Sequence, residues 1–128
     1  DRSGLPIGDA GSNITSRDMI KLGSLLANKG RWNGKQLISA VFLTKATSNI
    51  TKAAAEWHPD SFNYGYYFYQ SDIAVGDKSY DTNIVWGGGG QHIVIVEELD
   101  LVVAITGYDM EDIIFTQVAE KIIPAFVK

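Results

Sequence analysis

The C-terminal half of the chain contains two continuous apolar runs joined by a short connection. They lie within Gln91–Val96 and Leu101–Thr106, and the connecting residues are Glu97–Asp100. A connection this short joins neighbouring strands as an antiparallel hairpin. The two runs, IVIV and LVVAI, do not alternate with polar residues, which is typical of a sheet covered on both faces. The sequence therefore predicts a hairpin that lies between two layers of other structure.

Helix signals are concentrated in the N-terminal part. Residues Asp1–Asn13 are rich in Gly, Ser, Asp and Pro and are predicted to form a loop. Thr15 and Asp18 then form a capping-box pattern, and an apolar stripe with helical spacing follows. Gly30 is placed to end this helix in a left-handed turn. The stripe consists of Met19, Leu22, Leu25 and Leu26.

Turn and cap residues organise the next segment. Asn33-Gly34 suits a tight turn in which both residues have positive φ. Ser39 is predicted to cap a second, shorter helix that continues to about Thr47. Residues Ser48–Asn63 show no dependable period and are predicted to be irregular.

The remaining chain is predicted to form strands followed by a helix. Tyr64–Gln70 is aromatic and strand-like, residues 71–79 form a polar connection, and Tyr80–Trp86 is a further strand candidate. Glu111–Val127 is predicted to be helical, and Pro124 is expected to end or kink that helix. Its apolar face consists of Ile114, Val118 and Ile122.

Together these elements predict an α+β fold in a single domain spanning residues 1–128. We expect an antiparallel sheet of about three to four strands, with N-terminal helices and a C-terminal covering helix. The chain has 128 residues, of which 45% are hydrophobic, so it is long enough to bury a core.

Composition excludes several classes of function. The net charge is −4, so the chain lacks the basic surface that nucleic acid requires. No apolar run approaches the roughly 20 residues that span a bilayer, so we expect no membrane partner. Cysteine is absent, which excludes disulfides and thiolate chemistry. His58 and His92 have no carboxylate at ligand-like spacing, so neither a metal site nor a cofactor is expected.

The chain begins at Asp1 without methionine, which suggests a cut or processed end.

Four consecutive glycines, Gly87–Gly90, precede the apolar hairpin. They fit neither the phosphate-binding GxxxxGK[ST] loop nor the dinucleotide GxGxxG fingerprint, because His92 takes the third glycine position of the latter. Two interpretations remain open. The run is a glycine-rich bulge or turn between strands, or it is a strand edge without side chains, where a substrate contacts backbone amides. Such amides act as oxyanion donors or as partners for an added strand.

No catalytic nucleophile motif is present in the chain. The sequence has no GxSxG, no serine three residues before a lysine, and no KTG triplet. Ser61-Phe62-Asn63 matches an SxN pattern, but so short a pattern arises easily by chance. The acidic residues are better explained as helix N-terminal charges (Asp109, Glu111 and Asp112) and as a solvated hairpin turn (Glu97, Glu98 and Asp100).

Several stretches together resemble one protein family. "GSNITSRDMIKLGSLLANKGRWNGKQLIS", "YGYYFY" and "WGGGGQHIVIVEELDLVVAITG" resemble the serine β-lactamase-like hydrolases. These are the class C-like group of penicillin-binding-protein-related esterases and amide hydrolases. The resemblance covers nearly the whole chain from Gly11 onward, and Glu97 stands where the family commonly has proline. The matching residues of the first stretch are Thr15, Asp18, Met19, Gly23, Gly30, Gly34, Gln36 and Ser39.

The resemblance implies a helical region beside an antiparallel sheet and a partial active site. The family uses an SxxK serine, a Tyr-x-Asn motif and a Lys/His-[Ser/Thr]-Gly or Trp-Gly-Gly motif on the sheet's edge strand. This chain matches the third motif alone, with Trp86, Gly87 and Gly88. By resemblance, a backbone N–H near Gly88 or Gly89 is an oxyanion donor, and the motif lines the acyl-binding cleft. The missing lysine or histidine favours an ester or amide substrate over a penicillin.

The resemblance also implies that the nucleophile lies elsewhere. The first two family motifs lie upstream of the segment with which this chain begins, so the chain is expected to be the C-terminal portion of a longer hydrolase, inactive alone. Its partners would be the upstream half of that hydrolase and a small ester or amide substrate. Bacterial members are often exported, which implies a periplasmic location. Two alternatives stay open: a binding module that captures an extended peptide or small acid at Gly87–Gly90, and a purely structural domain.

Overall fold

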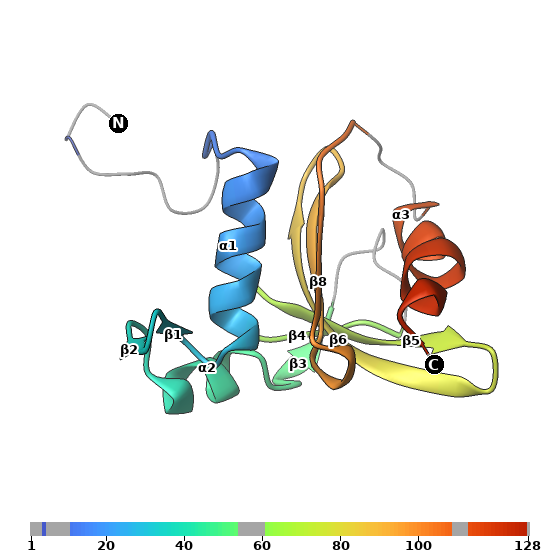
Figure 1. Cartoon of the computed structure of the whole chain (residues 1–128), viewed down its shortest axis with the longest axis horizontal. Helices are drawn as coiled ribbons and strands as arrows, with labels where there is room; N and C mark the ends of the chain where they lie inside the picture. Colours follow the sequence, from blue (N-terminus) through green and yellow to red (C-terminus); the bar gives the residue numbers. More distant parts are fainter. Residues whose placement is uncertain (1–3, 5–10, 54–60, 109–112, 128) are drawn as a thin grey trace.

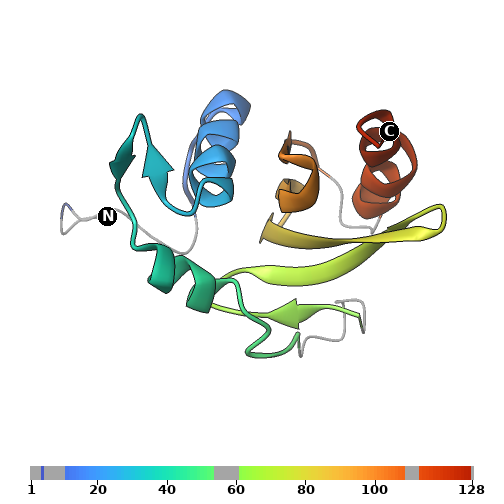
Figure 2. The ribbon, with the colours of Figure 1, turned by 60° about the horizontal axis from the view of Figure 1, so that its bottom comes forward.

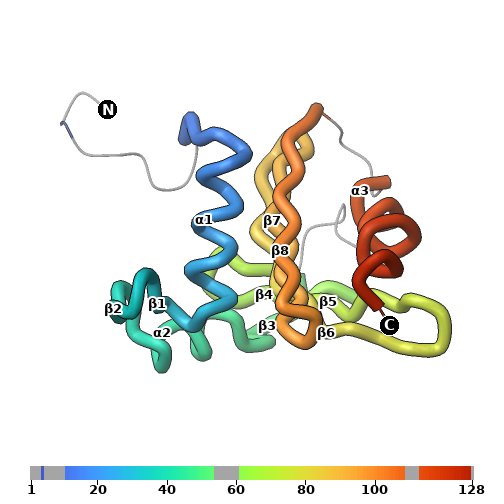
Figure 3. Tube along the Cα trace, viewed as in Figure 1, coloured from blue at the N-terminus to red at the C-terminus, as the bar shows by residue number. Residues whose placement is uncertain are grey.

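A curved antiparallel sheet lies between two helical layers. The structure, a computed structural model, describes residues 4, 11–53, 61–108 and 113–127. Helix α1 lies on one side of strands β7 and β8, and the C-terminal helical segment lies on the other (Figure 1). The tube in Figure 3 shows the same three layers from the same side. The α+β class is confirmed, with six strands in the main sheet instead of the expected three to four.

Helix α1 (Ser16–Ala27) begins where the capping pattern predicts. The Thr15 side chain accepts a hydrogen bond from the Asp18 backbone N–H at 3.2 Å, and its hydroxyl donates to the Asp18 carboxylate at 2.8 Å. The helix ends at Ala27 with Asn28 as its C-cap, and the N–H of Gly30 then bonds to the Leu25 carbonyl at 2.8 Å. Gly30 has φ +82°, which confirms the predicted left-handed turn.

A small hairpin and a short helix follow. Strands β1 (Arg31–Trp32) and β2 (Lys35–Gln36) pair across a turn in which Asn33 and Gly34 both have positive φ, as predicted. Helix α2 (Ala40–Ala46) is capped by Ser39, whose hydroxyl oxygen accepts from the Phe42 N–H at 3.3 Å. Figure 2 shows both elements beside α1, at one end of the molecule.

The main sheet has the strand order β3-β4-β5-β6-β7-β8, and every pair is antiparallel. Three sequence-based predictions are wrong here. Residues Ser48–Asn63 are not irregular throughout, because they include β3 and the first residue of β4. Tyr64–Gln70 is not one strand, because β4 ends at Tyr64 and β5 begins at Tyr69. The supposed polar connection at 71–79 holds most of β5 and the start of β6. The strands are β3 (Thr51–Lys52), β4 (Asn63–Tyr64), β5 (Tyr69–Val75), β6 (Lys78–Gly87), β7 (Gln91–Val96) and β8 (Leu101–Ile105).

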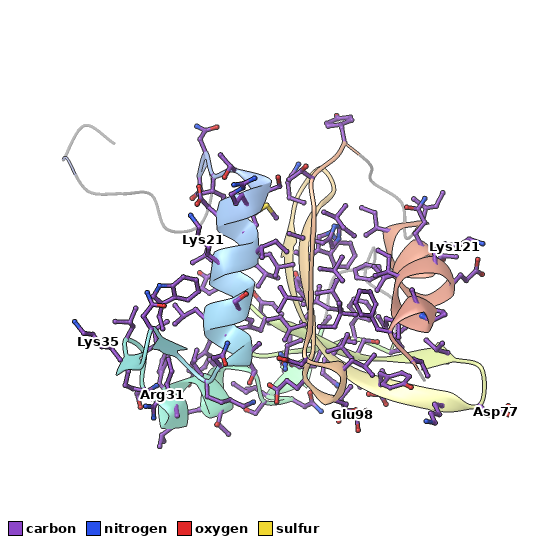
Figure 4. All side chains as sticks on the ribbon, viewed as in Figure 1. Lys21, Arg31, Lys35, Asp77, Glu98 and Lys121 are labelled. Atoms are coloured by element: carbon purple, nitrogen blue, oxygen red, sulfur yellow. The ribbon has the colours of Figure 1, made fainter. Side chains whose placement is uncertain are left out.

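At β7 and β8 the sheet is covered on both faces, as the two continuous apolar runs predict. On one face, Ile93 and Ile95 of β7 pack with Met19 of α1. On the other face, alternating strand residues pack with the C-terminal segment in the larger core. Figure 4 shows side chains filling both interlayer spaces, with charged groups such as Lys21 and Lys121 at the periphery. The turn between β7 and β8 contains a 3-10 helix, Glu97–Leu99, and Asp100 with φ 49°.

The C-terminal segment changes its winding along its length. It consists of α3 (Ile113–Gln117), a π-helical turn (Val118–Ile122) and a 3-10 turn (Ile123–Ala125) that contains Pro124. A π turn bonds each residue to the fifth one along instead of the fourth. The buried face therefore passes from Val118 to Ile123, and the predicted Ile122 is only partly buried.

Candidate functional site

The glycine run forms the turn of the β6–β7 hairpin. β6 ends at Gly87, which pairs with Gln91, and the three glycines between them make the turn. Gly89 and Gly90 have φ +94° and +93°, values that side chains strongly disfavour. Glycine is required at these two positions by the path of the backbone.

The family-like motif lies on an interior strand. β6 is flanked by β5 and β7, so the expectation of a sheet-edge strand is corrected. Pairing of β6 with β5 stops at Ile84, whereas pairing with β7 continues to Gly87. On the side that faces β5, the backbone of Val85–Gly87 therefore forms no strand pairing with β5. An added peptide strand would have this stretch alone to pair with, because the next three residues form the turn.

Gly88 is the least enclosed residue of the run. A Cβ atom built on it meets no heavy atom of the described chain within 4 Å, and its φ lies outside the positive region. A Cβ atom on Gly87 would lie 3.4 Å from Oε1 of Gln91, which is ordinary contact. None of the described residues closes the space beside Gly88.

Gln91 fixes the shape of the turn. Its Nε2 donates to the carbonyl oxygens of Gly89 at 3.1 Å and of Gly107 at 3.0 Å. The second bond joins the turn to the chain just after β8. The glycine run is thus tied to the neighbouring strand through one exposed side chain.

The Trp86 side chain is partly buried and packs against the larger core. Its indole packs edge-on against Phe115 of α3, with ring centroids 5.1 Å apart, and lies 5.5 Å from the Tyr69 ring. Phe62 completes this aromatic group at 5.9 Å. Because the ring packs inward, Trp86 would contribute to a substrate site mainly through its backbone.

His92 is buried beside this aromatic group. Its ring centroid lies 5.3 Å from that of Trp86 and 5.1 Å from that of Phe115. The side chain is 2% exposed, and neither ring nitrogen has a hydrogen-bond partner in the described part of the chain. Burial lowers the pKa of His92, and the nearby backbone of Gly90 partly opposes this shift. The imidazole is therefore neutral at pH 7.

Other residues singled out from the sequence are dispersed or lie outside the described ranges. His58, Asp109, Glu111 and Asp112 fall in residues that the structure does not describe. Phe62 of the SxN-like triplet is core, and its neighbours Ser61 and Asn63 line a polar cleft. In the described ranges, no group of three or more His, Asp or Glu side chains is arranged to hold a metal ion.

The polar cleft on the α1 side of the sheet was missed by the sequence analysis. It lies over β5 and β6, and its volume is about 440 Å³. The polar residues Gln70 and Asp72 of β5 lie opposite Asn83 and Asp81 of β6, so all four side chains share one face of the sheet. This relationship is visible only once the register of the two strands is known.

None of the described helices is long and apolar enough to cross a bilayer. A scan of the sequence against protein-family models found no match, and a search of curated proteins found none either.

Proposed function

We propose that this chain is the C-terminal part of a serine acyl hydrolase that cleaves a small ester or amide. In this proposal the β6–β7 turn supplies a backbone N–H, from Gly88 or Gly89, to the developing oxyanion. Such a donor stabilises the negative charge of the tetrahedral intermediate when it is fixed in place before the reaction. The serine nucleophile and its base belong to a polypeptide segment other than residues 1–128.

The observation that carries the proposal is the position of Trp86-Gly87-Gly88. The sequence motif resembles the third motif of the family, and it lies where β6 extends beyond its pairing with β5. Open space beside Gly88 leaves room for a carbonyl group. The bonds of Gln91 to Gly89 and Gly107 would keep the turn rigid, as a preorganised donor requires.

The 128-residue chain alone is expected to be inactive. It contains neither SxxK nor Tyr-x-Asn, and an oxyanion donor without a nucleophile has no acyl group to stabilise. In the complete hydrolase, this chain would contribute the sheet that lines one side of the substrate cleft and one backbone hydrogen bond to the oxyanion. Loss of a single oxyanion donor typically lowers kcat by about 100- to 1,000-fold.

Covalent labelling tests this proposal. The 128-residue chain and the longest polypeptide encoded by its gene are each treated with a fluorescent fluorophosphonate and a fluorescent penicillin. We expect a serine of the longer polypeptide to react with the fluorophosphonate, and no residue of the short chain to react. Absence of labelling in a folded longer polypeptide contradicts the proposal, as does labelling of a serine within residues 1–128.

Gly88→Val supplies the site-specific arm of the test. The variant is made in the longer polypeptide, and the added side chain would enter the space beside the turn. The rate of ester cleavage should therefore fall strongly, whereas the free energy of unfolding should fall only slightly. Ser79→Val is the matched control, because Ser79 is exposed at the opposite end of the same strand. Trp86→Ala is unsuitable, since it removes a large packed ring and would lower stability directly. Equal activity in the Gly88 and Ser79 variants would indicate a purely structural turn.

A further inference from the structure

Strand β8 forms one edge of the main sheet. It pairs with β7 along its whole length, and no strand of the described part of the chain lies on its other side. In Figure 3, β8 lies in front of β7, between α1 and the C-terminal segment. Along an edge strand, alternate residues direct their backbone N–H and C=O groups away from the sheet. β8 therefore carries a row of backbone groups with which a further strand would pair.

The two edges of the sheet differ in their protection against pairing between molecules. β3, at the other edge, consists of two exposed residues, and one of them is Lys52. Short edge strands and lysine side chains prevent such pairing. β8 has five residues, all apolar, with neither a charge nor a proline, and its pairing with β7 is continuous. Of the two edges, β8 is therefore the one suited to a partner strand.

The burial of side chains decreases from β7 to β8. Residues 93–96 of β7 are at most 4% exposed, whereas residues 102–105 of β8 are only partly buried. The even-numbered residues of this β8 stretch pack on the α1 side of the sheet, and the odd-numbered residues pack against the larger core. A partner strand beside β8 would therefore bury further apolar surface on both faces, which favours association.

We propose that two copies of this chain associate by antiparallel pairing of β8 with β8 across a two-fold axis at Val103. This register places Leu101 opposite Ile105 of the second copy. It also places Val102 opposite Ala104 of the second copy. Every opposing pair is then apolar, and no like charges face each other.

The two-fold arrangement also matches the layers of the fold. Opposing residues of the register belong to the same face, so the α1-side core and the larger core both continue into the second copy. One closed interface uses both β8 edges, and assembly therefore stops at two copies. The association does not depend on the proposed hydrolase function, because β7 separates β8 from the Trp86 motif on β6.

Sedimentation velocity of the 128-residue chain over a range of concentrations tests the association. We expect a reversible equilibrium between one and two copies, with a Kd of about 100 μM or tighter. A monomer at every concentration up to about 1 mM would overturn the proposal. Growth beyond two copies would also overturn it, since a closed two-fold interface leaves no β8 edge unpaired.

Amide hydrogen exchange locates the contact. The amides of β8 alternate between those that bond to β7 and those that point outward. When the concentration is raised, the outward set should exchange about tenfold more slowly or less, because pairing protects it. The amides of Thr51 and Lys52 at the β3 edge should be unchanged. Protection gained at β3 instead of β8, or at neither edge in a dimeric sample, would contradict the pairing.

Oppositely charged variants test the register. Val103→Lys and Val103→Asp each place like charges opposite each other, so each should raise the dimer Kd about tenfold. An equimolar mixture of the two should dimerise again. Val41→Lys is the matched control, because Val41 is 81% exposed on α2, and its Kd should equal that of the parent.

Two results with these variants would contradict the assignment. One is a dimer weakened by Val41→Lys and unaffected by the changes at Val103, which would place the contact on α2. The other is the absence of a dimer in the mixture when circular dichroism shows both Val103 variants to be folded. The exchange experiment uses the unaltered chain, so it decides the proposal even where a charged variant does not fold.

Discussion

Gly23 of α1 lies directly against Val102 of β8. A Cβ atom at position 23 would be 2.3 Å from Cγ1 of Val102 and 2.8 Å from Cγ2 of Ile93. Carbon atoms in favourable contact are separated by about 3.5–4.0 Å. The missing side chain therefore sets how closely α1 approaches the sheet, and α1 in turn covers the apolar face of β7.

Gly23→Ala is expected to lower the free energy of unfolding by about 1–2 kcal/mol. Alanine ordinarily stabilises a helix by about 1 kcal/mol relative to glycine. Here the added methyl group overpacks the helix–sheet contact, which typically costs about 1–3 kcal/mol or more. Urea unfolding measures the difference.

The control for this substitution is Gly88→Ala. Its Cβ atom meets no described heavy atom within 4 Å, so the free energy of unfolding should change by no more than about 0.5 kcal/mol. A Gly23→Ala protein as stable as the parent would show that α1 does not pack this tightly on β8.

Buried His92 predicts that the protein loses stability in mild acid. Because burial lowers its pKa, the unfolded chain takes up a proton at a higher pH than the folded chain does. The full stability is present above the unfolded pKa of about 6.5 and is lost as the pH falls toward the lower folded pKa. Urea unfolding at intervals from pH 8 to pH 5 should show this decline.

His92→Leu replaces the titrating imidazole with an apolar side chain of similar size. The variant should lack the decline assigned to His92, and at pH 5 it should be at least as stable as the parent. It also removes two buried nitrogens that have no partner in the described part of the chain. An unchanged pH dependence would mean that other groups control acid stability.

Gln91→Ala is expected to loosen the glycine turn. The substitution removes the hydrogen bonds to Gly89 and Gly107, and each such bond contributes about 0.5–1.5 kcal/mol. Because Gln91 is exposed, we expect a loss of about 1 kcal/mol in unfolding free energy. Amide exchange should accelerate at Gly89 and Gly107 and stay unchanged in α1. Uniform acceleration would indicate global destabilisation instead.

Features set by neighbouring residues were predictable from the sequence. The cap of α1 depends on Thr15 and Asp18, and the β1–β2 turn depends on Asn33 and Gly34; in each case the interacting groups are close along the chain. The β7–β8 hairpin was equally accessible, because a short connection leaves few ways to pair two apolar runs. Its coverage on both faces followed from the absence of polar alternation.

Features set by distant residues were not predictable in this way. β5 contains Ser71 and Asp72, which resemble a polar connection, and it becomes a strand because β6 pairs along its whole length. The same pairing places Trp86 on an interior strand and brings Asp72 opposite Asp81. The glycine motif was therefore visible in the sequence, while its surroundings and the polar cleft required the register of β5 and β6.

Two neighbouring isoleucines of the C-terminal segment test whether its buried face follows the helical spacing of the sequence or the π turn of the structure. An uninterrupted α-helix would place Ile122 in the core, following Ile114 and Val118. The π turn instead buries Ile123, which is 0% exposed, and leaves Ile122 partly buried. Ile123→Ala should lower the free energy of unfolding by about 3 kcal/mol, and Ile122→Ala by about 1 kcal/mol. Urea unfolding of both variants measures the order, and a larger loss at Ile122 would show that the segment is a regular α-helix.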